Sequence, residues 1–400
     1  MTKRILITGG PVHAFLDDVK IITNKFKGGL MAKLAGEFVD MAENLSREDK
    51  VNRGTEEADV HVTYLCSKNS QQPWWDDFLG GEDTPFLTCV HHNGIDDYME
   101  KVLALAPNMD AVVLGAAIAN LIPKNKIEGK FPSHNYKEGD TIPIDFTIAP
   151  RIIDRVKQVA PHTLLFGYKL LSGVDYNELV SAAYGVLLES KAVTVFANDA
   201  MDLMQKYAVT KERGVQPIRN DQVPEWILQR LGEKYYSTSM EKSHHTILQE
   251  MADGRDALNK ILCTQRSSFI HTDEGYVFGS GALYLGDHDK AHGFVTTTRG
   301  KNEVEDYAFV QDIDHDKRKV FVATDKKASL NAPLFDRVFK TFPKVAYILH
   351  FHHQRADLAT VDYATPGTDK DSQRVMVGPS FNIQGHGCIL SYTKTGELIK

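Results

Sequence analysis

Three histidines stand close together near the C-terminal end of the sequence, in the stretch LHFHH at 349–353. The apolar run KVAYI precedes them, so we expect them at the end of a β-strand. Side chains two residues apart on a strand share a face and lie roughly 6.6 Å apart along it. His350 and His352 can therefore point at one ion, while His353 turns away. A catalytic zinc site usually needs three protein ligands, and His386 is the candidate for the third.

A lone histidine of this kind is more often a hydrogen-bonded surface or core residue than a metal ligand. The order of the surrounding segments favours a metal site, because residues 290–395 resemble the class II aldolase and adducin family. The segments that carry the resemblance are GFVTTTRGK, KASLNAPLFDRVFKTFPKVAYILHFHHQ, YATPGTDKDS and His386 with its following glycine. The resemblance implies Zn²⁺ or another divalent metal on His350, His352 and His386.

The same resemblance implies that Thr298, Gly300 and Ser329 bind a substrate phosphate, although Ser329 is also a candidate N-cap of the following helix. In that family the metal acts as a Lewis acid on a hydroxy-ketone, and a glutamate handles the proton. Here Asn331 stands in the place of that glutamate, and an amide cannot serve as a general base. The candidates to replace it are His353, Asp357, Asp362 and Tyr392.

At the other end of the chain, the apolar run RILIT at 4–8 is followed by two glycines. This pattern predicts a strand that ends in a loop open to a phosphate, with a plain tight turn as the alternative. Strand and helix patterns then alternate, which predicts an α/β fold with a Rossmann-like, doubly wound, mostly parallel sheet. The expected strands are 59–66, 110–118, 163–170 and 192–199. One helix is expected to start at Leu30, and three others are expected at 95–106, 177–191 and 223–235.

The second half has a different pattern, with short strands and one helix at 329–342. The stretch STSMEKSHH at 237–245 is typical of a linker or of the start of a second unit. We therefore expect two domains, a nucleotide-binding domain at 1–238 and a class II aldolase-like α/β, metal-binding domain at 239–400.

Several segments of the first half, over about 1–235, occur in an order that resembles phosphopantothenate-cysteine ligase, an enzyme of coenzyme A synthesis. They are ITGGPVHAFLDDVKIITNKFKGGLMAKLAGEF, DAVVLGAAIANLIP, KNKIEGK, LLFGYKLLSG and VTVFANDAM. The implied reaction is activation of the phosphopantothenate carboxylate by CTP or ATP with Mg²⁺. Attack by the amine of cysteine then forms an amide.

The resemblance also implies roles for particular residues. Asn24 falls where the family holds its activated acyl intermediate, and Lys126 lies in a mobile, lysine-rich loop where it neutralises phosphate charge. Structural alternatives are a helix cap for Asn24 and a solvated lysine at 126. The implied nucleotide or substrate contacts are Gly9, Gly10, Gly28, Gly29, Ala116, Ala117, Asn120, Lys169, Asn198 and Asp199. Asn120 stands where the family usually has an acidic residue.

Composition limits the other functions. A formal net charge of -7 argues against nucleic acid or an acidic membrane surface as a partner. The four cysteines form no C-x-x-C pair, and the longest apolar run is too short to cross a bilayer, so we expect a reduced, cytoplasmic protein.

The leading hypothesis is a bifunctional enzyme, a ligase half fused to a metal-binding half, which acts on small molecules as a homo-oligomer. One alternative is a metal-dependent sugar-phosphate aldolase, epimerase or dehydratase with a regulatory nucleotide-binding half. Another is that the aldolase-like half is an assembly module without chemistry.

Overall fold

The computed structural model describes residues 2–49, 60–73, 86–212, 214–240, 245–272, 277–286, 293–301, 303–374 and 377–400. The chain divides into two compact units, residues 1–211 with 217–231, and residues 212–216 with 232–400. This division falls a few residues before the boundary expected at 238, because Tyr236 packs in the core of the second unit. Residues 237–240 form strand β15 (Ser237–Met240), so at these positions the second unit begins and a linker is excluded.

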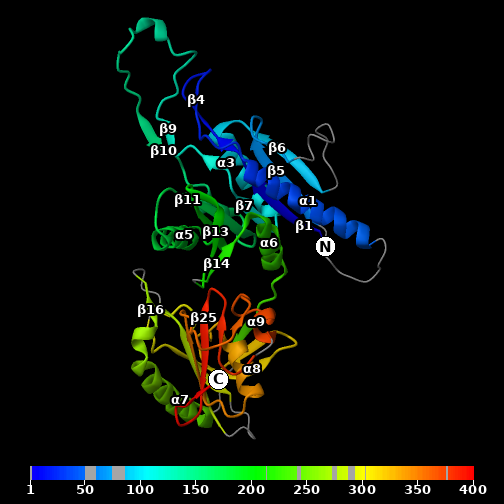
Figure 1. Cartoon of the computed structure of the whole chain (residues 1–400), viewed down its shortest axis with the longest axis vertical. Helices are drawn as coiled ribbons and strands as arrows, with labels where there is room; N and C mark the ends of the chain where they lie inside the picture. Colours follow the sequence, from blue (N-terminus) through cyan, green and yellow to red (C-terminus); the bar gives the residue numbers. More distant parts are fainter. Residues whose placement is uncertain are drawn as a thin grey trace. The chain divides into compact units, whose positions relative to one another are not determined.

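The first unit is built on an eight-stranded sheet with the order β14-β13-β12-β11-β7-β1-β5-β6 (Figure 1). Its strands are β1 (Lys3–Thr8), β5 (Val60–Ser67), β6 (Leu87–His92), β7 (Ala111–Leu114), β11 (Leu164–Leu171), β12 (Thr194–Asp199), β13 (Asp202–Thr210) and β14 (Val215–Ile218). The strands from β6 to β12 are parallel, and β13 is antiparallel to β12. Along the chain, the parallel strands run outward from β1 through β5 to β6, and then outward on the other side from β7. This order is that of a doubly wound α/β fold, as the sequence predicts.

Helices cover both faces of this sheet. They are α1 (Gly29–Asp49), α3 (Gly94–Leu105), α4 (Ile153–Val159), α5 (Tyr176–Ser190) and α6 (Val223–Gly232). Phe38 of α1 and Ile227 of α6 pack in one core with Ile5, whose side chain marks the first face. Tyr98 of α3 lies on the opposite face, where its hydroxyl donates to Thr8 Oγ1 at 3.1 Å.

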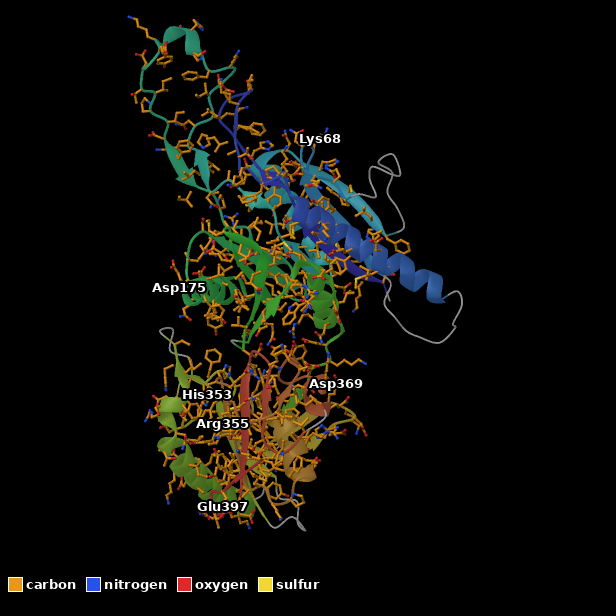
Figure 2. The ribbon with its side chains drawn as sticks, viewed as in Figure 1. Lys68, Asp175, His353, Arg355, Asp369 and Glu397 are labelled. Carbon is orange, nitrogen blue, oxygen red and sulfur yellow. The ribbon has the colours of Figure 1, made fainter. Side chains whose placement is uncertain are left out.

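Local signals explain where some of these elements begin and end. Helix α5 begins after Asp175, whose side chain accepts a hydrogen bond from Glu178 N at 2.9 Å (Figure 2). The strand expected at 110–118 is shorter than predicted, because it ends at Leu114 and a separate short strand, β8 (Ala117–Ile118), pairs with β2 (Pro11–Val12). The sequence analysis missed strand β6 altogether.

A long hairpin extends from the first unit between β9 (Leu121–Pro123) and β10 (Phe146–Ile148), which pair antiparallel (Figure 1). The buried carboxylate of Asp17 anchors it, because Asp17 accepts hydrogen bonds from Phe131 N at 2.9 Å and from Lys20 Nζ at 3.0 Å. The lysine-rich loop predicted at 124–130 therefore starts this hairpin. Two further short strands, β3 (Ala14–Phe15) and β4 (Ile21–Ile22), flank Asp17.

The second unit contains a mixed, mainly antiparallel sheet with the order β15-β21-β20-β19-β18-β22-β25-β24-β23, and β26 pairs with β25. Its strands are β18 (Ser280–Tyr284), β19 (Phe294–Thr297), β20 (Tyr307–Asp314), β21 (Lys319–Val322), β22 (Tyr347–Phe351), β23 (Thr360–Val361), β24 (Phe381–Ile383), β25 (Gly387–Tyr392) and β26 (Leu398–Ile399). A separate ribbon pairs β16 (Ile270–His271) with β17 (Val277–Phe278). Both units are thus α/β, but the strands of the first sheet are mostly parallel, whereas those of the second are mainly antiparallel.

Helices pack against this second sheet on its two faces. Phe335 of α8 (Ala332–Thr341) lies in one core with Ile348 of β22, whereas Leu258 of α7 (His245–Thr264) lies in another with Leu349. A short helix, α9 (Asp369–Gln373), contacts α8. Helix α7 was not predicted from the sequence. In the part of the chain that the structure describes, none of the helices combines the length and apolar character needed to cross a bilayer.

Replacing Gly10 with alanine is expected to destabilise the first unit. Gly10 has a φ of +75°, and an added Cβ would lie 1.8 Å from Ser70 Oγ. Gly173→Ala is the matched control, because Gly173 has a φ of +70° but its Cβ would meet nothing within 4 Å. We expect the control to lose about 1 kcal/mol through backbone strain. Gly10→Ala should lose on the order of 1–3 kcal/mol more.

Urea unfolding followed by tryptophan fluorescence measures this difference, because Trp226 packs against the core of the first unit. Equal losses of unfolding free energy in the two variants would contradict the tight contact at Gly10.

Candidate functional site

The two strands at which the first sheet reverses its winding, β1 and β7, end side by side. The loops that follow them are joined, because Ala117 N donates to Gly10 O at 2.9 Å. Ala116 N donates to Thr8 Oγ1 at 3.3 Å. Doubly wound proteins bind ligands in the crevice outside the carboxyl ends of the strands at this reversal. The structure thus brings the predicted glycine loop and the predicted alanine pair to the position where a nucleotide is expected.

Two glycines from different segments meet in this crevice. Gly28, with a φ of +87°, lies so close to Gly10 that an added Cβ would be 2.4 Å from Gly10 N. Helix α1 begins at Gly29, with Met31 N and Ala32 N both donating to Gly28 O at 3.0 Å. The first turn of α1 carries no acidic residue. A helix N-terminus without acidic residues suits a phosphate group.

Asn24 lies in the segment before this helix, but it does not cap it. Its Nδ2 donates to Ile118 O at 2.8 Å, which ties the segment to β8. The helix-cap alternative for Asn24 is therefore wrong. The side chain lies beside the alanine pair that follows β7, within the same crevice.

Lys126 lies at the start of the long hairpin and forms an ion pair. Its Nζ is 2.5 Å from Asp18 Oδ1, and both side chains are about half exposed. The pair also holds the hairpin backbone, because Gly129 N donates to Asp18 Oδ2 at 3.0 Å. An exposed ion pair contributes roughly 0–1 kcal/mol, so a phosphate can compete for the lysine at little cost.

The remaining predicted residues of the first unit lie near the carboxyl ends of β11 and β12. Lys169 is on β11, opposite Ala197 of β12. The carboxylate of Asp199 already has partners within the chain, because it accepts hydrogen bonds from the backbone amides of Met201, Gly173 and Val174. These bonds lower the pKa of Asp199. Asn198 is buried, whereas Asn120 is exposed and uses its backbone oxygen to accept from Ala149 N at 2.8 Å.

The loop after β5 also lies at this edge of the sheet, although no sequence pattern predicted it. Ser70 lies against Gly10 and shares a 2.7 Å hydrogen bond with Ser67. The hydroxyl of Tyr64 donates to Gln71 O at 3.2 Å. No spacing pattern marks these residues, because their proximity depends on the pairing of β1 with β5.

In the second unit, His350, His352 and His386 come together, with one nitrogen atom from each ring within 4.8 Å of the others. His350 lies on the α8 face of β22, as the alternation with Leu349 requires. His353 stacks on Phe351, with 5.4 Å between ring centroids, and is not part of the cluster. The backbone of Gly387 allows the close turn of His386, because a Cβ there would lie 1.9 Å from Phe351 O.

The protonation of these rings suits a metal. His350 Nδ1 bonds to Cys388 O at 3.1 Å, which fixes the proton on Nδ1 and leaves Nε2 as the acceptor. His350 Nε2 and His386 Nδ1 are both buried and have no hydrogen-bond partner among the described residues. Burial lowers the pKa of His350 to about 4, and it lowers that of His386 well below the ordinary value. The rings are thus neutral near pH 7, which is the form that binds a divalent ion.

The distances also fit such an ion. Three nitrogens bound tetrahedrally to zinc at about 2.1 Å would lie roughly 3.4 Å apart. In the structure these nitrogens lie within 4.8 Å of one another. Side-chain rotations that move each nitrogen by about 1 Å would bring them to the separation that zinc requires. His350, His352 and His386 therefore fit a divalent metal, and they leave its remaining positions open to a ligand.

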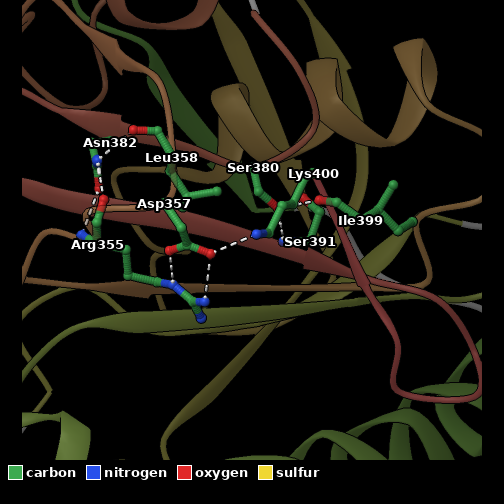
Figure 3. Close-up of polar contacts among 8 residues, drawn as sticks. All are labelled: Arg355, Asp357, Leu358, Ser380, Asn382, Ser391, Ile399 and Lys400. Carbon is green, nitrogen blue, oxygen red and sulfur yellow. Dashed lines mark hydrogen bonds and ion pairs between the residues drawn. The ribbon is translucent and has the colours of Figure 1, made fainter.

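The residues proposed as the proton carrier are differently placed. Asp357 is paired with Arg355 at 2.9 Å and with Lys400 at 2.7 Å (Figure 3), so its pKa lies far below that of a general base. Tyr392 stacks on Tyr347, with 4.8 Å between ring centroids, and burial raises its pKa. Figure 3 also shows Asn382 bonded to the backbone of Arg355, which fixes the loop after β22. Among the described residues, Asp362 does not belong to the group of potential metal ligands that the histidines form.

The predicted phosphate residues of the second unit lie at a shallow pocket and beside it. Thr298 Oγ1 donates to Asp306 Oδ2 at 3.0 Å, and Gly300 has a φ of +65° with open space around it. Asn331 is the N-cap of α8, so the prediction of Ser329 as the cap is wrong, and Ser329 Oγ instead accepts from Asn331 N at 3.2 Å. The pocket is lined by Tyr236, Thr238, Arg299, Val320, Ala328, Ser329, Leu330, Pro333 and Gly367.

No family model matches the chain. Among solved structures, the DNA/pantothenate metabolism flavoprotein of Streptococcus pneumoniae is 21% identical with a TM-score of 0.44, and covers 57% of this chain and 98% of its own. A Cab2 mutant in complex with phosphopantothenate-cysteine is 15% identical with a TM-score of 0.46, and covers 57% of this chain and 86% of its own. The aldolase-like protein YgbL of Klebsiella pneumoniae is 14% identical with a TM-score of 0.25, and the match covers 35% of this chain and 79% of YgbL. Because these TM-scores lie below 0.5, the fold assignment rests on the strand order described above.

Two proteins are related in sequence. The coenzyme A biosynthesis bifunctional protein CoaBC of Thermococcus kodakarensis is 27% identical over 198 residues, which are 49% of this chain and 41% of that protein. CoaBC of Methanocaldococcus jannaschii is 20% identical over 215 residues, which are 52% of this chain and 45% of that protein. The chain thus spans less than half the length of the curated relatives it matches. Over about half of its own length, the chain resembles the coenzyme A biosynthesis protein CoaBC.

Proposed function

We propose that the first unit is a nucleotide-dependent ligase that joins phosphopantothenate to cysteine. The observation that carries this proposal is the convergence of Gly10, Gly28 and Ala117 at the reversal point of a doubly wound sheet. The relationship to CoaBC supports the same assignment, since those proteins are named for coenzyme A biosynthesis. Whether the nucleotide is CTP or ATP is decided by the experiment below.

The residues of the crevice have separable tasks in this reaction. Gly10 and Gly28 let the loop after β1 pack directly against the start of α1, because a Cβ at Gly10 would meet Ser70 and a Cβ at Gly28 would meet Gly10. The phosphates would bind beside this contact, at the N-terminus of α1. Asn24 lies beside the loop after β7 and would hold the activated acyl group. Lys126 would leave Asp18 and neutralise the charge that develops on the departing pyrophosphate. Mg²⁺, when bound with the nucleotide, supplies further charge neutralisation.

Lys126→Ala is expected to lower the rate of pyrophosphate release about 100-fold or more, because the lysine acts on charge that develops in the transition state. The assay contains the full chain, phosphopantothenate, cysteine, Mg²⁺ and either CTP or ATP. Lys124→Ala, in the same loop and also exposed, is the matched control and should keep the rate of the unmodified protein. Equal rates for the two variants would remove Lys126 from the mechanism, and no release with either nucleotide would reject the ligase.

A second function is favoured by the histidine cluster, and we propose that the second unit binds a divalent metal and acts on a small hydroxylated substrate. His350, His352 and His386 would hold the ion, which supplies Lewis-acid chemistry when bound. The carbonyl of Cys388 orients His350 for this purpose. Aldol cleavage by the usual glutamate base does not fit, since Asn331 occupies that position in the chain.

His352→Ala is expected to weaken binding of Zn²⁺ or Co²⁺ more than about 100-fold, because it removes one of three ligands. His353→Ala is the matched control, since this neighbouring ring stacks on Phe351 outside the cluster. Metal content after dialysis, measured by inorganic mass spectrometry, should be one ion per chain for the control and near zero for His352→Ala. Equal content in both variants would place the ion elsewhere.

A further inference from the structure

A buried cation lies close to the three histidines. Lys301 is only 6% exposed, and its Nζ donates to the backbone oxygen of Gly279. The next residue, Ser280, pairs with His350 across β18 and β22. The ammonium of Lys301 is therefore held one residue before the position on β18 that pairs with His350.

This cation has no direct counterion in the described part of the chain. Asp306 raises the pKa of Lys301 from a distance, but its carboxylate is bonded to Lys326 and to Thr298. The other nearby cation, Arg374, is paired with Asp371 at 2.5 Å. Burial lowers the pKa of Lys301 to about 8, so the side chain remains mostly charged near pH 7.

The charges of the site therefore do not balance once an ion is bound. Three neutral imidazoles would carry the divalent ion, and Lys301 adds a further positive charge beside them. A buried charge is costly unless it is paired and hydrogen-bonded. A ligand that brings negative charge relieves this cost, whereas a neutral ligand leaves it in place.

An unpaired acceptor adds a second requirement. Asn331 is buried, and its Nδ2 donates to Ser280 Oγ at 3.2 Å. Its Oδ1 has no hydrogen-bond partner among the residues that the structure describes. An acceptor of this kind needs a donor from the ligand. A carboxylate alone and a fully ionised phosphate have none, but a hydroxyl group next to a carboxylate provides one.

We propose that the histidine centre binds a small 2-hydroxycarboxylate, with its carboxylate paired to Lys301 and its hydroxyl donating to Asn331 Oδ1. This inference rests on the proposed metal centre and names the class of substrate for it. Compounds of this class also bind divalent ions well, because their carboxylate and hydroxyl oxygens lie close together. Lys301 thereby becomes a substrate-binding residue.

The test uses the full chain loaded with Co²⁺, whose visible absorption changes when a ligand binds near it. Glycolate is the probe, ethylene glycol is its uncharged analogue, and inorganic phosphate is the competing anion. Lys301→Met is expected to weaken glycolate binding at least about 10-fold, because it removes a charge-assisted hydrogen bond. Lys327→Met, at an exposed lysine nearby in the fold, is the control and should leave the affinity unchanged.

Asn331→Asp is a second, nearly isosteric variant, and it should also weaken glycolate binding, because the new carboxylate repels the ligand. Lys301→Met is expected to fold, since an apolar side chain of similar length replaces a buried charge. Circular dichroism and the cobalt content, both measured before glycolate is added, check this in each variant.

The outcomes separate this inference from the metal centre on which it rests. A chain that takes up no cobalt rejects the metal centre and the ligand class with it. A chain that takes up one cobalt ion, but binds glycolate equally with and without the Lys301 charge, rejects only the ligand class. Tighter binding of phosphate or of ethylene glycol than of glycolate would also overturn it.

Discussion

In the first unit, the backbone of Gly28 lies against the backbone of Gly10, and the arrangement of the surrounding loops depends on this contact. A single Cβ at Gly28 would come within 2.4 Å of Gly10 N. The contact places the start of α1 at the end of β1, where the loop after β7 also arrives. Parallel strands bring these loops to one edge, where the two glycines let the backbones touch and Ser70 packs against Gly10. A candidate ligand site at this edge follows from the position of the loops at the reversal of the sheet.

In the second unit, side chains form the candidate binding site. Strand alternation puts His350 toward the α8 face, while Leu349 and Phe351 fill the core under α7. His352 follows the end of β22 and joins His350 and His386 in the cluster. Burial lowers the pKa of His350 and of His386, and one nitrogen of each of these two rings has no partner among the described residues. Burial also makes the positive charge of Lys301 costly. The packing of the sheet therefore favours a ligand that carries negative charge.

The sequence was sufficient where a pattern has a direct structural cause. Apolar runs rich in β-branched residues predicted the parallel strands, and the two-residue period predicted that His353 lies apart from its neighbours. Patterns of mixed polarity were not sufficient. Strand β6 contains polar residues along its length, and α7 is apolar only along one side, which carries Leu258 and Leu262.

Contacts that depend on strand pairing were also beyond the sequence. Ser70 reaches Gly10 only because β5 pairs with β1, and Lys301 reaches the histidines only because β18 pairs with β22. The cap of α8 was assigned to Ser329 on residue type, although the chain turns two residues later, at Asn331.

The measurement that tests the central claim most directly is amide hydrogen exchange of the full chain, with and without Mg²⁺ and CTP or ATP. The account predicts slower exchange in peptides that contain Gly10, the start of α1 and the loop after β7, together with the hairpin loop at Lys126. It predicts no change in peptides around His350 and His386. No protection with either nucleotide, or protection confined to the second unit, would contradict the assignment of the crevice.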